Sequence, residues 1–372
     1  MATVAKTKRL VGVDTLRAFA AVLVVVGHDL HFINELPHAL GGGIHIPMFG
    51  AGLGAILLLF AAGFMSVYVG WNRFGEAGQS SQYLLKRAAR LVPFYWFFTT
   101  VWLLIALLLP QLVSAKFPST ASIIMSYLFI PHRNADSFIY PILALGWTMN
   151  YIFLFDVITA LFLRFRRDLA IAAIILTSAA LAVAHRWTFQ MDPSIYFWTG
   201  RFVILYAGGA LMSLIYKTWV EPAGGFTLNG WWSTLLLLGG VAASAPFLQS
   251  PFGYEFTRDF VALLPIVAFM GVVAVLTRES ASTPIQWVRD KVAMSAYSVY
   301  LTHPFTLGIA ILVWKKAHLY TILSPWMLFV GALVASLIVA YVVHVAIEMR
   351  VNKLAWSLLF GRRQQPRAAT AG

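Results

Sequence analysis

Long apolar segments recur along the whole chain and are separated by short polar connections. Ten of them approach the roughly twenty residues that an α-helix needs to cross the hydrocarbon core of a bilayer. They cover residues 11–33, 50–70, 92–111, 143–163, 169–185, 198–216, 230–248, 260–277, 294–314 and 325–347. Within each segment the apolar residues run on continuously, whereas the strands of a membrane β-barrel alternate over about ten positions. The pattern therefore predicts an all-α, polytopic transmembrane bundle of about ten spans.

The connections between these segments are too short to form a separate soluble domain. The longest are 71–91 and 112–142, and the second contains a short apolar stretch, 118–130, that we expect to be re-entrant or interfacial. Any chemistry must therefore use side chains within the bundle or at its rims. We predict one membrane domain over residues 1–360 and a disordered, basic, cytoplasmic tail over 361–372.

Composition supports this class. The chain of 372 residues is 60% hydrophobic and only 11% charged, whereas soluble domains contain about 25% charged residues. It has no cysteine, so neither a disulfide framework nor a thiol nucleophile is available. The first apolar segment is too long for a signal peptide and lacks a small-residue cleavage site after it.

The placement of charge accounts for the net charge of +13. If the N-terminus is cytoplasmic, most lysines and arginines outside the spans fall on the cytoplasmic side. The other side holds only Lys116, Arg133, Arg186, Arg258, Lys315 and Lys316. This asymmetry follows the positive-inside rule with both termini cytoplasmic. The lipid bilayer is thus the expected partner, and the excess of basic residues is explained without binding to nucleic acid.

The first apolar segment carries two candidate functional residues, Arg17 and His28. They are eleven residues apart, which is close to three helical turns and about 16 Å, so they share one face at different depths. His28 is a candidate general base, and the alternative is a histidine satisfied by a backbone carbonyl of a neighbouring helix. Arg17 is a candidate anion clamp, and the alternative is an arginine that reaches to the inner interface beside Asp14.

Further charged candidates lie at the cytoplasmic entry to the third span and within the fourth. Arg87 and Arg90, spaced i and i+3, project from one helical face, either to bind the phosphates of a cytosolic donor or as ordinary positive-inside anchors. Asp156 lies in the middle of a span, and we expect Asp14 and Asp156 to be the only acids well inside the spans. Because a buried carboxylate needs a partner, Arg17 or the Arg87–Arg90 pair are candidate partners for Asp156.

Polar residues in the outer half of two spans complete the candidate set. Trp147 and Asn150, with Thr148 between them, lie in the same helix as Asp156. His303 precedes Pro304, which loosens the helical hydrogen bonding and lets polar groups line a cavity, although a structural histidine fits the pattern equally well. The glycines at 41–43 follow no strand and do not form a phosphate-binding loop. His38 and His45 have no carboxylate pattern around them, so no metal site is predicted.

Five stretches, taken in order, resemble the acyltransferase-3 family of bacterial integral-membrane O-acyltransferases. Asp14-Thr15-Leu16-Arg17-Ala18 with His28 resembles the family's Asp-Gly-Leu-Arg-Ala and Arg-x10-His signature. Ala62-Gly63-Phe64 is similar to its Ser-Gly-Phe. Arg87 and Arg90, followed by Pro93 and Tyr95, resemble its Arg-x-x-Arg-Ile-x-Pro-x-Tyr.

The last two stretches point to a subgroup. Trp147-Thr148-Met149-Asn150-Tyr151 resembles the Trp-Thr-Leu-Asn-Tyr-Glu of members that modify exopolysaccharides. The segment from Ser298 to His303 is similar to the family's Ser-x-x-x-Tyr-Leu-x-His. Together the five stretches extend over most of the chain.

The resemblance implies transfer of an acyl group, usually acetyl, from cytosolic acyl-coenzyme A, a co-substrate rather than a bound cofactor, to a hydroxyl of a carbohydrate or lipid-linked glycan. On that basis His28 is the catalytic base or acyl carrier, and Arg17, Arg87 and Arg90 bind the donor or hold the bundle core. Trp147, Asn150 and His303 are the expected substrate-binding residues.

The chain departs from the family pattern at three positions. Thr15 replaces a glycine and Ala62 a serine, and neither carries chemistry. Ile152 stands where the family has a glutamate, and Asp156 lies one turn further on the same helical face. We therefore hypothesise that Asp156 takes over part of the glutamate's catalytic role.

Two other function classes fit the same residues. In a transporter or flippase for a glycan or small anion, Arg17, His28 and Asp156 line a substrate or proton path. In a non-catalytic binding or scaffold protein, the missing glutamate marks lost activity. Dependence on acyl-coenzyme A separates the enzyme from both.

Overall fold

The computed structural model describes residues 10–40, 51–110, 116–134, 136–224, 227–248, 258–277 and 284–361. In these segments the regular structure is helical apart from two isolated β-bridges. The long helices are α1 (Val11–Asn34), α2 (Ala51–Gly70), α3 (Gln79–Leu108), α5 (Gly146–Phe162), α6 (Arg167–Ala184), α8 (Val203–Ile215), α10 (Gly230–Ser244), α11 (Arg258–Leu276), α13 (Ala296–Lys316) and α14 (Pro325–Val343). The shorter ones are α4 (Thr120–Tyr127), α7 (Pro193–Trp198), α9 (Glu221–Ala223), α12 (Pro284–Met294) and α15 (Met349–Phe360).

The all-α prediction is confirmed, and each of the ten predicted spans coincides with one of the long helices. Eight described segments are apolar and long enough to cross a bilayer by length and composition. Helices α5 and α10, with 17 and 15 residues, are not among these eight segments, and the 13-residue α8 is counted within the longer segment Pro193–Ala223. The apolar stretch at 118–130 forms only the eight-residue α4, which is capped by the Ser119 side chain and is too short to cross. The predicted disordered tail, 361–372, lies outside the described residues apart from Gly361.

One predicted connection is helical. We expected 71–91 to be a loop, but α3 already begins at Gln79 and continues through Pro93 to Leu108. The polar, arginine-bearing segment is thus the first part of the same helix. Likewise, α14 does not end the fold: the π-helix η7 (His344–Glu348) joins it to α15. Both differences arise because polar residues on one helical face break the apolar run without breaking the helix.

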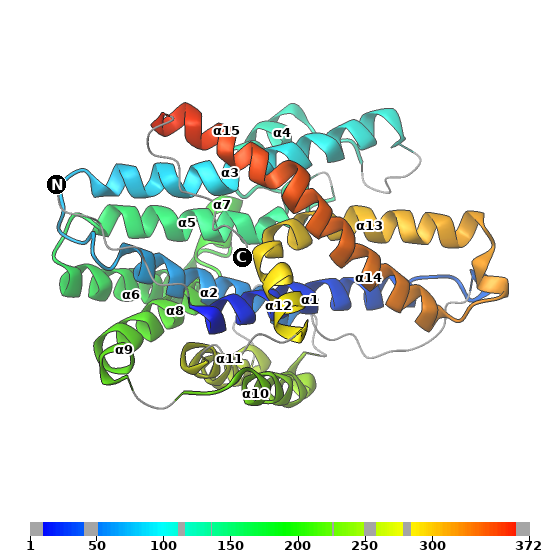
Figure 1. The fold of residues 1–372 in the computed structure, drawn as a ribbon. Helices are drawn as coiled ribbons and strands as arrows, with labels where there is room; N and C mark the ends of the chain where they lie inside the picture. Colours follow the sequence, from blue (N-terminus) through cyan, green and yellow to red (C-terminus); the bar gives the residue numbers. More distant parts are fainter. Residues whose placement is uncertain are drawn as a thin grey trace.

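Helix α1 lies at the centre of the arrangement, packed against α2, α11, α12, α13 and α14. In Figure 1, α1, α3, α5 and α13 run across the view, α14 lies diagonally over α1 and α13, and α15 continues from it to α3. Helices α10 and α11 pack on each other and are seen nearly end-on below the rest. We call the face of the bundle where α1 begins the N-terminal face, and the other the opposite face.

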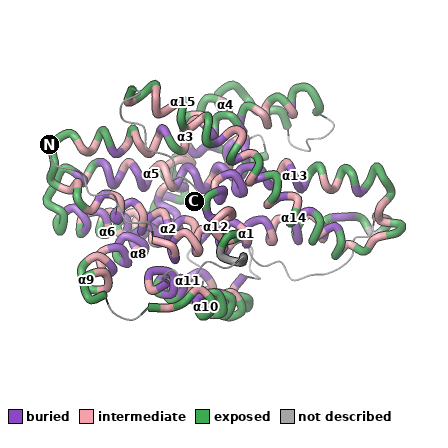
Figure 2. The backbone as a smooth tube through the Cα atoms, in the orientation of Figure 1, coloured by how far each residue is buried: buried purple, intermediate pink, exposed green. Residues whose placement is uncertain are grey.

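Burial follows the membrane pattern. Figure 2 shows buried residues concentrated where the helices face one another and exposed residues along their outer sides. Many outward-facing side chains are large and apolar, for example Leu107, Leu176 and Leu358. Such a surface is suited to lipid, and the interior instead holds the polar groups.

Glycine packing fixes α2 against α8. A Cβ atom on Gly209 of α8 would collide with the carbonyl oxygen of Phe60, and one on Gly63 of α2 would collide with that of Tyr206. Small residues let two membrane helices approach backbone to backbone. This tight pair forms one wall of the main apolar core, which α1, α5, α6 and α11 complete.

Candidate active site

Two histidines predicted as site residues, His28 and His303, lie side by side. Their imidazole ring centroids are 5.0 Å apart, and the ring planes are inclined at 47°. His28 comes from α1 and is partly buried, whereas His303 comes from α13 and is completely buried. Packing of α1 against α13 therefore brings both residues into one site.

Backbone hydrogen bonds determine which nitrogen of each ring is available. Nδ1 of His28 lies 2.8 Å from the carbonyl oxygen of Val24, one turn earlier in its own helix. Nδ1 of His303 lies 3.0 Å from the carbonyl oxygen of Val299 in the same way. A carbonyl oxygen can only accept, so both Nδ1 atoms carry the hydrogen. In the neutral form, each Nε2 atom is then a hydrogen-bond acceptor and a potential base.

This arrangement differs from the structural alternative for His28, a hydrogen bond to a neighbouring helix. The bond to Val24 orients the ring but leaves Nε2 uncommitted. Nε2 of His303 is buried and has no hydrogen-bond partner within the described part of the chain. An unpartnered buried polar atom costs about 1–3 kcal/mol, so a site for a hydrogen-bonding ligand is the natural interpretation of the pair.

The start of α5 forms a wall beside the histidines. The Tyr300 hydroxyl donates to the carbonyl oxygen of Leu145 and accepts from Thr148 Oγ1, both at 2.7 Å. The Tyr300 ring centroid is 6.2 Å from that of His303. Pro304 has no N–H to bond the Tyr300 carbonyl, so α13 lacks one helical hydrogen bond at this turn. The prediction that the proline lets polar groups gather is consistent with this geometry.

The other two expected substrate-binding residues differ in their surroundings. Asn150 is buried, and its Oδ1 atom has no hydrogen-bond partner among the described residues. Trp147 packs on Phe202 and Tyr151, with ring centroids 5.0 and 6.1 Å away. It therefore contributes to the apolar core beside α8, and its ring contacts do not include the two histidines.

Asp156 has a partner from the predicted arginine pair. Arg87 Nε lies 2.8 and 2.9 Å from the two carboxylate oxygens of Asp156, and the Tyr83 hydroxyl donates to Oδ1 at 3.0 Å. Asp156 is 1% exposed. Tyr83 and Arg87 project one turn apart from α3, within the segment that we had predicted to be a loop. Beside the pair is a cavity of about 10 Å³, which is room for about one water molecule.

The other two predicted arginines, Arg17 and Arg90, form weaker ion-pair contacts than Arg87 or none among the described residues. Arg17 Nη1 lies 3.6 Å from Asp14 Oδ1, and both side chains are 25% exposed. Arg90 is exposed and forms no ion pair with a described carboxylate. The charges of Arg17, Arg87 and Arg90 are nevertheless close enough to repel one another. The structure thus brings the three predicted arginines together, with Arg87 neutralised by Asp156, Arg17 in a longer contact with Asp14, and Arg90 available to an anion.

Sequence reasoning did not single out the buried acid Glu348. It lies in the π-helix η7, accepts from Ser298 Oγ at 2.6 Å and is 2.7 Å from His344 Nδ1. Its charge also interacts with those of Arg17 and Arg90. The expectation that Asp14 and Asp156 are the only acids well inside the spans is therefore wrong, and Asp29 of α1 is buried as well. The His344–Glu348 spacing of i and i+4 was the available signal, but the predicted span ended one residue short of Glu348.

Comparison with known proteins shows which protein family has this sequence. A family described as an acyltransferase domain matches residues 10–345. The exopolysaccharide production protein ExoZ of Rhizobium meliloti (strain 1021) is 28% identical over 233 residues, which are 61% of this chain and 68% of that protein. No solved structure matches.

The helical fold and the family match together define a multi-pass membrane acyltransferase. The chain belongs to the acyltransferase-3 family, as the five stretches of sequence predicted. The roles of the individual site residues stay predictions, including the catalytic role expected of Asp156.

Proposed function

We propose that this acyltransferase transfers an acyl group, most simply acetyl, from cytosolic acyl-coenzyme A to a hydroxyl of an exopolysaccharide. The family match supports the reaction type, and the name of the similar ExoZ protein supports the acceptor class. The single observation that carries the mechanism is the orientation of His28, whose Nδ1 is occupied by the Val24 carbonyl.

In this proposal Nε2 of His28 is the general base. It takes the proton from the acceptor hydroxyl while the hydroxyl oxygen attacks the thioester carbonyl carbon. The new ester bond forms as the carbon–sulfur bond breaks, and the coenzyme A thiolate receives the proton back from His28. His303, 5.0 Å away between ring centroids, offers a second acceptor nitrogen to hydroxyl groups of the incoming sugar.

The donor enters from the N-terminal face, which we assign to the cytoplasm from the distribution of basic residues. Arg90 is free to pair with phosphates, and Arg17 is held only by its 3.6 Å contact with Asp14, whereas Arg87 is committed to Asp156. Helix α1 runs unbroken from Val11 to Asn34. Its geometry therefore separates Arg17 from His28 by about 16 Å along the axis, a distance that an extended pantetheine arm can cover.

The acceptor approaches from the opposite face, near the end of α1 that carries His28. This assignment gives an inner-membrane protein with a cytoplasmic donor side and an exterior acceptor side. It also assigns Arg87 and Asp156 a positioning role: their ion pair joins α3 to α5 beside the donor path.

The test uses membranes that contain the full chain, acetyl-coenzyme A labelled in the acetyl group, and purified exopolysaccharide. We expect label in the polysaccharide with the wild type and a loss of about 10²–10⁴-fold in His28→Ala, the usual contribution of a general base. His31→Ala is the matched control, since His31 lies one turn further along the same helix and is exposed.

Label that appears equally in His28→Ala and the wild type would exclude the proposed base. Movement of glycan across the membrane without any need for acyl-coenzyme A would favour the transporter alternative instead. Thermal unfolding of each purified variant in detergent separates lost chemistry from lost folding.

A further inference from the structure

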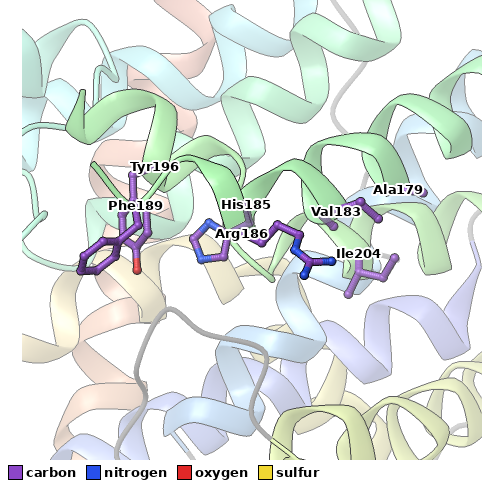
Figure 3. Close-up of a pocket in the computed structure, with 8 residues that line it drawn as sticks. Ala179, Val183, His185, Arg186, Phe189, Tyr196 and Ile204 are labelled. Atoms are coloured by element: carbon purple, nitrogen blue, oxygen red, sulfur yellow. The ribbon is translucent and has the colours of Figure 1, made fainter. Parts of the chain in front are cut away.

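A groove of about 840 Å³ lies on the outside of the bundle between α6, the short helix η3 (His185–Trp187), α7 and α8. Its volume falls in the range of about 300–1,000 Å³ typical of small-molecule sites. None of its lining residues belongs to the candidate active site. Figure 3 shows its lining side chains in a row, with an aliphatic end, a basic centre and an aromatic end.

The aliphatic end lies within a membrane-spanning segment. Ala179 and Val183 come from α6, and Ile204 faces them from α8. The apolar segment that includes α6 extends from Arg167 to Trp187 and is long enough to cross a bilayer. This end of the groove is therefore at the depth of hydrocarbon chains.

The basic centre lies where that segment ends. His185 and Arg186 follow directly after α6 and lie between the two apolar ends of the groove. Arg186 is exposed, and none of the described carboxylates forms an ion pair with it. Its guanidinium lies 5.0 Å from the Trp187 ring centroid. An arginine beside an interfacial tryptophan is at the level of lipid headgroups, where its guanidinium can pair with a phosphate.

The aromatic end lies beyond the segment that contains α6. Phe189 follows that segment, and Tyr196 comes from α7, at the start of the next candidate spanning segment, Pro193–Ala223. The Tyr196 ring packs on the His185 ring at 4.7 Å and on the Phe189 ring at 6.0 Å, between centroids. Phe189 is 69% exposed. The exposed apolar faces of such rings suit the C–H groups of a polyol or sugar ring.

We propose that this groove binds an anionic lipid whose phosphate carries a sugar or polyol headgroup. The hydrocarbon chain lies along Val183 and Ile204, the phosphate pairs with Arg186, and the headgroup ring packs on Tyr196 and Phe189. The order of the three parts along the groove matches their order in such a lipid and their depth in the membrane. The proposal concerns binding alone and does not depend on the acyl-transfer reaction.

The probe is phosphatidylinositol with a photoreactive diazirine in its acyl chain, incorporated into phosphatidylcholine nanodiscs that hold the full chain. Equally photoreactive phosphatidylcholine is the comparison lipid. After illumination, mass spectrometry quantifies label on residues 179–204. We expect about tenfold more label from phosphatidylinositol than from phosphatidylcholine, because both lipids carry a phosphate but the choline ammonium repels Arg186 and offers no ring to Tyr196 and Phe189.

Arg186→Gln should reduce labelling by phosphatidylinositol about tenfold, to the level of phosphatidylcholine, and Arg186→Lys should retain most of it. Arg133→Gln is the control, because Arg133 is an exposed arginine outside the groove, and it should change nothing. Equal labelling by the two lipids, or undiminished labelling in a folded Arg186→Gln protein, would overturn the proposal. So would displacement of label by millimolar inorganic phosphate, which would indicate a site for free phosphate.

Discussion

Arg87 of α3 donates from Nε to both carboxylate oxygens of Asp156 on α5, at 2.8 and 2.9 Å. Asp156 lies one turn beyond Ile152, which occupies the position of the family's glutamate. The carboxylate that remains in this part of the chain thus pairs with Arg87, one of the three arginines that lie together near the N-terminal face. Because Tyr83 also donates to it, Asp156 is held in a fixed position beside the proposed path of the donor.

Asp156→Asn should impair both stability and transfer. The substitution leaves the Arg87 guanidinium without its counter-charge. We expect a loss of about 3 kcal/mol, the low end for a broken buried pair, because Arg87 retains some exposure. Thermal unfolding in detergent and labelled transfer in membranes measure the two effects. Asp168→Asn is the control, since the Asp168 side chain is 80% exposed. Full transfer activity in Asp156→Asn, with His28→Ala inactive, would refute a role for Asp156.

Arg90 should bind the donor rather than stabilise the fold. It is exposed, lies close to the charges of Arg17 and Arg87, and has no carboxylate partner among the described residues. Arg90→Ala should raise KM for acetyl-coenzyme A about tenfold with little change in kcat or in unfolding temperature, since one charge-assisted contact to phosphate is lost. Arg90→Lys should recover part of the affinity.

Arg166→Ala supplies the comparison for this experiment, because Arg166 is an exposed arginine on the N-terminal face. Its KM should equal that of the wild type. If both variants raised KM equally, the effect would be general attraction by the basic face. The specific role of Arg90 would then be wrong.

His303→Ala should weaken binding of the acceptor. The buried Nε2 of His303 has no partner in the described structure, whereas a sugar hydroxyl would supply one. We expect KM for the polysaccharide to rise about tenfold and KM for acetyl-coenzyme A to stay the same. His318→Ala serves as the control, because His318 is exposed just beyond the end of the same helix. An unchanged KM for the polysaccharide would indicate that His303 has only a structural role in the packing of α13 and does not bind the acceptor.

The helices were predictable because each apolar run encodes its own span. The Arg87–Asp156 pair was predictable in part, since a buried acid requires a cation and the sequence offers few. Tyr83 was not, because its segment is polar enough to resemble a loop, and only packing on α5 reveals that the helix continues there. The local sequence pattern thus predicts that a helix exists, whereas the tertiary contacts determine where it begins and ends.

The pairing of His28 with His303 lay beyond sequence reasoning. No spacing rule relates α1 to α13, so their contact depends on how the whole bundle packs. The tautomer of each imidazole ring could not be predicted from the sequence either, because it depends on the distance from Nδ1 to a particular carbonyl oxygen. Glu348 was overlooked for a different reason. The π-helix η7 carries the chain past the predicted end of the last span, and the acid that follows is buried instead of exposed.

Glu348 should contribute to stability chiefly through its hydrogen bonds. Both Ser298 Oγ and His344 Nδ1 contact the same oxygen, Oε2. Glutamine can place its carbonyl oxygen there, so Glu348→Gln should lose the charge but keep both bonds. Glu348→Ala leaves two buried groups without a partner, at about 1–3 kcal/mol for each. Urea unfolding in detergent should therefore rank the wild type and Glu348→Gln well above Glu348→Ala, with Ser298→Ala between them. Equal stability of the Gln and Ala variants would mean that the charge near Arg17 and Arg90, and not the hydrogen bonding, is what Glu348 supplies.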